Sequence, residues 1–274
     1  MKPRIAITAI FFATAGLAAA PGDSTGFNLL PLALQKDPQI PMNVITEVTP
    51  DGKNVTPATP AKPVYYVCQD GGMVQGGGIV AGERPPAIDT LEAAMVKALA
   101  VNGYLSANSA HRPALFIYYR WGSFNAFARG SHAPKEARQA NAIQRASIIG
   151  GDAFAAKVSE VIYSNNPNHV WEKEYQANLA LLNARYLYFL IATAYEVDAN
   201  QHHETLLWTT KMCTPSEGVT MAEAIPVLLA NAAPYFGREM TVAQPLKVHL
   251  RQGEVTAGPA TVKGYIAPDA TPQK

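Results

Sequence analysis

The stretch Ala114-Leu115-Phe116-Ile117-Tyr118-Tyr119-Arg120-Trp121 decides the fold of this chain. It carries one charged residue among aliphatic and aromatic side chains, which is typical of a strand buried on both faces. Such a strand lies inside a sheet. We therefore expect the segments on either side of it to supply neighbouring strands and covering helices.

The segments that precede this strand predict a strand, a helix and a second short strand. Residues 64–68 form an apolar run with the composition of a strand. The glycines at positions 71–72 and 76–78 predict an exposed glycine-rich loop or a small hairpin. Residues 89–101 repeat apolar side chains on one helical face, with Asp89 as the expected cap and Asn102-Gly103 as the end. Residues 104–109 then predict a short strand or turn.

The segments that follow predict a helical insertion over residues 134–183. Pro134 lies where a first helical turn would begin. Gly150-Gly151 and Asn165-Asn166-Pro167 interrupt the apolar periodicity, so we expect three amphipathic helices.

The second half of the chain predicts a β-hairpin and a closing helix. Residues 185–197 are nearly all apolar and long enough to cross the middle of a sheet, and residues 206–213 return after a polar turn. Thr220 and Glu223 form a capping box for the closing helix, which we expect Pro226 to kink or shorten. The fold class that follows is α+β (α/β-like), with a mixed β-sheet, a β-α-β-β core, a helical insertion, a β-hairpin and a closing helix.

The first twenty residues predict a secretory signal peptide and therefore an exported protein, either periplasmic or secreted. Lys2 and Arg4 precede an uncharged run that ends in alanines, with cleavage expected before Ala19 or Pro21. An uncleaved N-terminal anchor is the alternative. No cysteine near residue 20 offers a lipid attachment site, and no later stretch has the length of a membrane span.

The remaining chain predicts a single domain with two loose ends. Prolines recur through residues 21–62, which we interpret as an arm or linker. Residues 63–252 form the α+β domain, and residues 253–274 form a flexible tail.

Charge and cysteine content exclude several classes of function. Removing the leader leaves 20 basic and 21 acidic residues, a net charge of −1, so we expect no binding to nucleic acid. The two cysteines, Cys68 and Cys213, could form one disulfide in an oxidising compartment or stay reduced.

No catalytic, cofactor or metal pattern emerges. Ser123 follows the central strand and could act with His132 in a serine hydrolase, but Asn125 occupies the second glycine position of the G-x-S-x-G pattern. The glycine stretches lack the spacing of phosphate-binding loops, so no cofactor is expected. The clustered His202-His203-Glu204 lacks metal-ligand spacing and is explained by a solvated turn.

Aromatic residues are abundant on the predicted strands of the domain. Most must be buried, but strands with aromatic side chains on both faces leave some exposed for interface contacts. The residues expected to contribute to binding, at and after the end of the central strand, are Arg120, Trp121, Ser123 and Asn125.

The order of these elements resembles a known group. A helix ending Asn102-Gly103-Tyr104, a strand ending Tyr119-Arg120-Trp121-Gly122 and the later Leu207-Trp208-Thr209-Thr210 are similar to uncharacterised exported bacterial proteins with a lipoprotein-like α/β envelope domain of unknown function. The resemblance covers residues 63–240 and implies a module of envelope assembly, without catalytic residues to carry over. This chain departs from the lipoproteins because it lacks the cysteine after the signal.

We therefore expect a soluble, non-enzymatic protein of the envelope that acts through protein contacts, with a protein partner or a second copy. The helical insertion and the hairpin are the expected contact elements. Two alternatives stay open: a serine-type hydrolase that uses Ser123, and a small-ligand binding protein that uses the aromatic strands.

Overall fold

The computed structural model describes residue 35 and residues 38–78, 83–128, 130–164, 170–197 and 205–250. All of them belong to one compact unit, Pro31–Lys274. The expected signal peptide, the polar turn at residues 198–204 and the tail at residues 253–274 lie outside the described residues. No helix in the described ranges is long and apolar enough to cross a membrane.

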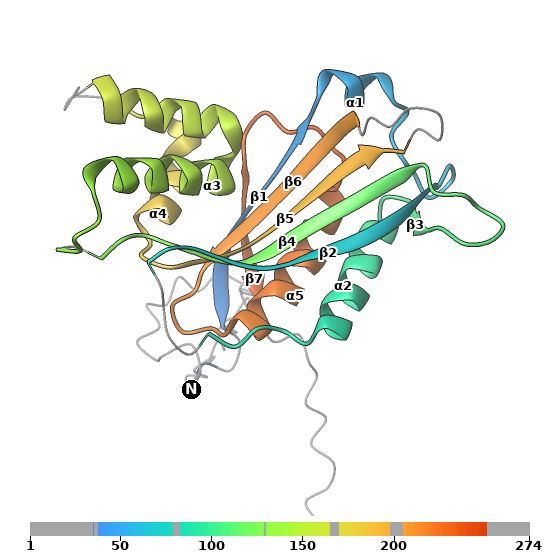
Figure 1. Cartoon of the computed structure of the whole chain (residues 1–274), viewed down its shortest axis with the longest axis horizontal. Coiled ribbons are helices and arrows are strands. Elements are labelled where there is room, and N and C mark those ends of the chain that lie inside the picture. Colours follow the sequence, from blue (N-terminus) through green and yellow to red (C-terminus); the bar gives the residue numbers. More distant parts are fainter. Residues whose placement is uncertain are drawn as a thin grey trace, which may run out of the picture. The chain divides into compact units, whose positions relative to one another are not determined.

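The unit is built on a mixed, seven-stranded sheet in the order β3-β2-β4-β5-β6-β1-β7 (Figure 1). β2 is parallel to β3 and β4, and the other neighbours are antiparallel. The predicted α+β class with a mixed sheet is confirmed. The strands are β1 (Gln39–Val48), β2 (Val64–Gly77), β3 (Tyr104–Ser106), β4 (Leu115–Asn125), β5 (Leu187–Glu196), β6 (Thr205–Pro215) and β7 (Gln244–His249).

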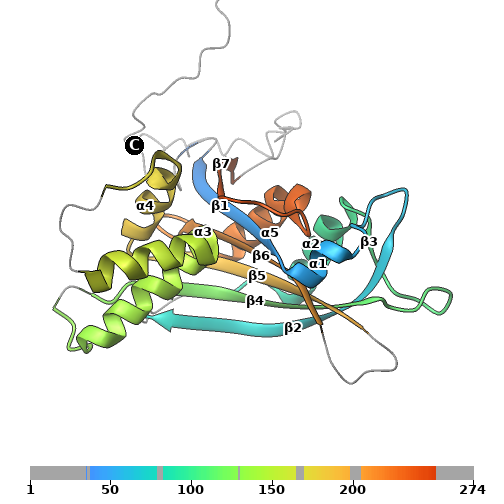
Figure 2. The same ribbon diagram turned by 90° about the horizontal axis from the view of Figure 1, so that it is seen from above.

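Helices cover the two faces of the sheet unequally, and each side has its own apolar core. On one face α2 and α5 pack over the strands and bury a large cluster that includes Leu91, Leu228 and Ile117. On the other face α3 and α4 cover one end of the sheet, where Phe154 and Phe189 belong to a smaller cluster (Figure 2). The helices are α1 (Pro50–Asn54), α2 (Ile88–Ala100), α3 (Lys135–Ser164), α4 (Gln176–Asn183) and α5 (Met221–Ala232).

The details of three helices test the expected boundaries. α3 breaks at Gly151, whose φ of 79° is non-helical, as the glycine pair predicts. α5 has the expected capping box of Thr220 and Glu223 and continues through Pro226. Asp89 does not cap α2, because Ala87 occupies the N-cap position without a side-chain hydrogen bond.

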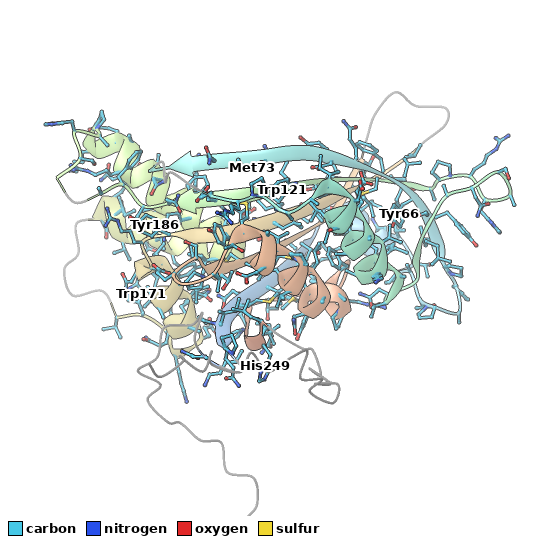
Figure 3. All side chains as sticks on the ribbon, turned by 90° about the horizontal axis from the view of Figure 1, so that it is seen from below. Tyr66, Met73, Trp121, Trp171, Tyr186 and His249 are labelled. Carbon is cyan, nitrogen blue, oxygen red and sulfur yellow. The ribbon has the colours of Figure 1, made fainter. Side chains whose placement is uncertain are left out.

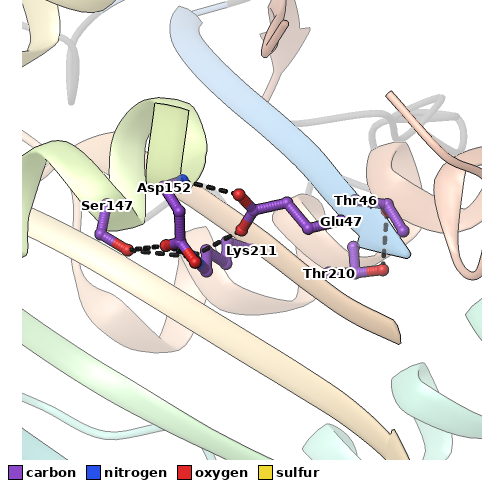
Figure 4. A network of polar contacts seen from close by, with 6 residues as sticks. All are labelled: Thr46, Glu47, Ser147, Asp152, Thr210 and Lys211. Carbon is purple, nitrogen blue, oxygen red and sulfur yellow. Dashed lines mark hydrogen bonds and ion pairs between the residues drawn. The ribbon is translucent and has the colours of Figure 1, made fainter. Parts of the chain in front are cut away.

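A buried lysine joins α3 to the sheet beside the break at Gly151. Lys211 Nζ lies 2.7 Å from Glu47 Oε2, 2.8 Å from Asp152 Oδ1 and 2.9 Å from Ser147 Oγ (Figure 4). Burial raises the pKa of Asp152, but the hydrogen bond and charge of Lys211 outweigh it and hold this pKa below its ordinary value. Two carboxylates and one hydroxyl surround the Lys211 ammonium group, so the network links α3 to the sheet and stabilises the fold.

The arm predicted over residues 21–62 is wrong for its second half. β1 lies inside the sheet between β6 and β7, and Met42 and Val44 on it are fully buried. Pro41 lies within β1, and Pro50 begins α1, so these prolines belong to regular elements. The domain therefore starts before residue 63.

The exposed loop or small hairpin predicted at the glycines of residues 71–72 and 76–78 is also wrong, because β2 continues through them as one strand to Gly77. A Cβ atom at Gly71 would lie 2.2 Å from the Tyr118 hydroxyl oxygen, and one at Gly76 would lie 2.4 Å from the Phe124 ring. Aromatic side chains of β4 thus cover these two glycines of the neighbouring strand, an arrangement that stabilises glycine in sheets.

The alternative of a disulfide between Cys68 and Cys213 is wrong. Cys68 lies on β2 and Cys213 on β6, with β4 and β5 between them, and both thiols are free. Three strand spacings amount to about 14 Å, twice the separation that a disulfide can bridge.

Candidate functional site

The outer side of β2 is an unpaired sheet edge. β3 pairs only with Val64–Tyr66, although β2 extends to Gly77. Within the described ranges no strand pairs with the outer side of β2 beyond Tyr66, and β2 forms the border of the sheet in Figure 2. An edge of this length is able to accept a further strand.

The main-chain groups of this edge alternate in direction. Val64 N donates to Gly103 O at 3.0 Å, and Tyr66 O accepts from Ala107 N at 2.8 Å, so these two residues point toward β3. The alternation of a strand directs Cys68 and Asp70 to the same side, beyond the end of β3. Their N–H and C=O groups are therefore open to an added strand.

The edge is only partly protected against pairing. A bulge between Asp70 and Met73 interrupts the register with β4, and Gly72 there has a φ of 79°. Val67 and Met73, each 42% exposed, flank the bulge with apolar side chains. Figure 3 shows Met73 on β2 beside Trp121 of β4.

A cavity of about 350 Å³ opens beside this edge, between β2, α2 and the segment at β3. We call it the acid pocket, because it contains two carboxylates and neighbouring hydroxyl and thiol groups. Its polar lining residues are Tyr66, Cys68, Asp70, Glu92, Ser106 and Tyr119.

The acid pocket carries the negative charge of two carboxylates, of which Asp70 is half-buried and Glu92 is exposed. The Asp70 carboxylate accepts hydrogen bonds from Trp121 Nε1 at 3.1 Å and from Gly72 N at 2.7 Å, which fix its position. Neither Asp70 nor Glu92 forms an ion pair with any described residue. The described residues include no group of three side chains that could hold a metal ion.

Two protonated groups border these carboxylates. Tyr119 is 2% exposed, and its hydroxyl has no hydrogen-bond partner among the described residues. Burial raises the pKa of Tyr119, and the charge of Asp70 raises it further. Desolvation in the pocket wall, with the charges of Asp70 and Glu92, raises the pKa of Cys68 to about 12. The thiol is therefore protonated at neutral pH and is a poor nucleophile.

The four residues predicted for binding do not form one site. Trp121 is buried and positions Asp70 at the acid pocket. Arg120 is exposed on the opposite face of the sheet, 6.0 Å from the Tyr118 ring centre. Asn125 is buried; its Nδ2 donates to Gly78 O at 2.9 Å, and its Oδ1 accepts from Leu187 N.

Ser123 lacks the surroundings of a hydrolase nucleophile. It is 1% exposed, and its hydroxyl donates to Glu83 Oε2 at 2.8 Å. His132 is exposed, and no histidine in the described ranges forms a hydrogen bond with Ser123. The serine is held as a structural contact between β4 and Glu83.

The sequence predicts that some strand aromatics are exposed, and three of them are half-buried. Phe116, Tyr118 and Tyr195 lie on the face that carries Arg120, and the rings of Phe116 and Tyr195 are 6.4 Å apart. Because Val67 pairs with Phe116, this aromatic surface adjoins the β2 edge.

A second cavity, of about 510 Å³, lies between α1 and the sheet, with Tyr104 and Trp208 in its wall. Its charged groups are satisfied within the protein. Lys53 pairs with Glu239, and Arg238 donates to Ala58 O at 3.1 Å. The acid pocket differs because, in the part of the chain that the structure describes, its two carboxylates form no ion pair.

Sequence reasoning missed Asp70, Glu92 and Tyr119 as members of one site. Asp70 follows a predicted strand and Glu92 lies on a predicted helix, but only the course of β2 through its glycines brings them together.

Comparison with known proteins leaves the family open. No protein-family model and no curated protein matches the chain. A solved structure, a PDZ domain protein from Parabacteroides distasonis ATCC 8503, is similar with a TM-score of 0.39 and 12% identity over 77% of this chain. The chain spans 39% of the length of that protein.

Proposed function

We propose that this is a non-enzymatic interaction protein of the cell envelope, which binds an extended segment of a partner polypeptide as an added strand on β2. The observation that supports the proposal is the open edge beyond Tyr66, where Cys68 and Asp70 direct their main-chain groups outward. The apolar N-terminal run supports export, and so does the resemblance to envelope proteins.

The surroundings of the edge favour a partner strand over a small substrate. Strand addition derives affinity from main-chain hydrogen bonds and specificity from pockets for alternate side chains. Here β3 ends at Ser106, and no described strand continues along β2 beyond it. The exposed Val67 and Met73 offer apolar contacts, and the acid pocket opens beside this part of the edge.

Photo-cross-linking in the native host tests the proposal. A benzoylphenylalanine side chain is placed at Val67 or Gln69, next to the edge, and for comparison at Tyr163, which is exposed on α3. We expect one envelope protein to be linked from the first two positions, through peptides that mass spectrometry maps to a single segment.

An edge-blocking variant supplies the control. Cys68→Pro removes an outward N–H that bonds to no described residue, and proline is tolerated where a strand edge faces solvent. Cys68→Ala loses the same thiol but keeps the N–H. We expect at least a fivefold loss of the link in the proline variant only. Equal links in both folded variants, or links only between copies of this chain, would overturn the proposal.

A small-ligand binding function is the second candidate, and the cavity lined by Tyr104 and Trp208 favours it. A metabolite that binds there would raise the melting temperature of the protein, because binding to the folded state stabilises it. A Trp208→Phe variant would lose that shift.

A further inference from the structure

We propose that the segment bound at the β2 edge inserts a basic side chain, lysine or arginine, into the acid pocket. This inference rests on the strand addition proposed above and specifies the chemistry of the partner. It follows from the position of the pocket, from two carboxylates that have no ion-pair partner among the described residues, and from the buried Tyr119 hydroxyl, which has no described hydrogen-bond partner.

The position follows from the geometry of β2. Successive residues of β2 alternate between its two faces. The pocket on the α2 side of the sheet is lined by Tyr66, Cys68 and Asp70, and Val67 and Gln69 lie between them in the sequence. A strand added in line with β3 would place every second side chain on that same side. One of them would enter the pocket between β2 and α2.

The charge of the pocket selects a cation. Two carboxylates, Asp70 and Glu92, face one cavity without a positive group among the described residues. A partner carboxylate there would be repelled and an apolar side chain would gain no electrostatic attraction, whereas an ammonium or guanidinium group would face two carboxylates. A metal ion is a poorer occupant, because no three suitable ligands converge in the described ranges.

The hydroxyl of Tyr119 completes the set of acceptors. It is buried in the pocket wall and has no described hydrogen-bond partner, an arrangement that costs free energy in the unbound protein. An ammonium group has three donors, and a guanidinium has five. The carboxylates of Asp70 and Glu92 and the oxygen of Tyr119 supply three acceptors that would match the ammonium group.

Paired peptides test this inference on the full mature chain. The probes are two capped heptapeptides of alternating threonine and valine, one with lysine at the centre and the other with norleucine. We expect the lysine peptide to bind at least tenfold more tightly by calorimetry, with an affinity that falls as salt is added. In the double variant Asp70→Asn, Glu92→Gln the two peptides should bind alike.

Tyr119→Phe provides a control that does not endanger the fold. The variant loses a hydroxyl that has no described partner, so its melting temperature should equal or exceed that of the wild type. We expect the variant to bind the lysine peptide about threefold more weakly and to bind the norleucine peptide with unchanged affinity.

The outcomes separate the two proposals. If both peptides bind with equal affinity and Cys68→Pro abolishes the binding of both, the edge accepts a strand, but the proposal that the pocket takes a basic side chain is wrong. If neither peptide binds, or if Cys68→Pro leaves binding intact, strand addition itself is wrong, and this inference fails with it.

Discussion

Replacing Arg145 with methionine should destabilise the domain more than the replacement of an exposed residue does, because this buried guanidinium joins three elements. Arg145 is 1% exposed on α3. Its Nη1 donates to Phe124 O at 3.1 Å and to Arg185 O at 3.2 Å, and its Nη2 donates to Leu182 O at 3.3 Å and to Ala184 O. These carbonyls lie in β4, at the end of α4 and just before β5.

The expected cost follows from those four carbonyls. Methionine retains much of the apolar stem but no donor, and each unsatisfied buried acceptor costs about 1–3 kcal/mol. Hydration of some carbonyls reduces the sum, so we expect a loss of about 3–5 kcal/mol in the free energy of unfolding, as for other broken buried charge contacts. In a domain of this size, this lowers the melting temperature by roughly 10 °C.

Urea denaturation and thermal melting measure the effect, with Arg185→Met as the matched control. Arg185 is exposed and contacts the Tyr186 ring, so its replacement should change stability by less than about 1 kcal/mol. A cost for Arg145→Met that is no larger than this control would refute the role assigned to the guanidinium.

Three further predictions concern the sheet, the acid pocket and the lysine network. Gly122→Ala should cost more than about 2 kcal/mol by urea denaturation, because φ is 148° and the new Cβ would lie 1.9 Å from Val74 O. Alkylation of Cys68 by iodoacetamide should be slow at pH 8 and still rise at pH 10, because its pKa is about 12; a plateau near pH 9 would contradict this. Since the pKa of Asp152 is lowered in the folded state, its pairing with Lys211 contributes stability above about pH 4 that is lost as pH falls through the folded value. The stability gap between wild type and Asp152→Asn should therefore narrow between pH 6 and pH 3.

The sequence predicts the elements whose patterns are local. The helix at residues 88–100 and the helix break at Gly151 follow from apolar periodicity and glycine, and the capping box at Thr220 and Glu223 is visible as a motif. The hairpin of β5 and β6 is predicted because its strands are long and apolar. These signals depend on neighbours within a few residues.

The elements that were missed depend on partners far along the chain. β2 tolerates Gly71 and Gly76 because Tyr118 and Phe124 of β4 cover them. β1 carries Pro41 inside the sheet, and β7 pairs with it from about 200 residues away. The acid pocket could not be predicted from the sequence for the same reason, because Asp70 and Glu92 line one cavity only when β2 lies beside α2.

Hydrogen exchange of the backbone amides along β2 tests the central claim most directly. In the protein alone we expect slow exchange at Val67 and Gln69, which point toward β4, and fast exchange at Cys68 and Asp70, which point outward. In the complex with the cross-linked partner, the amides of Cys68 and Asp70 should also become slow. Slow exchange at all four amides in the protein alone would show that the edge is already occupied and would contradict the account.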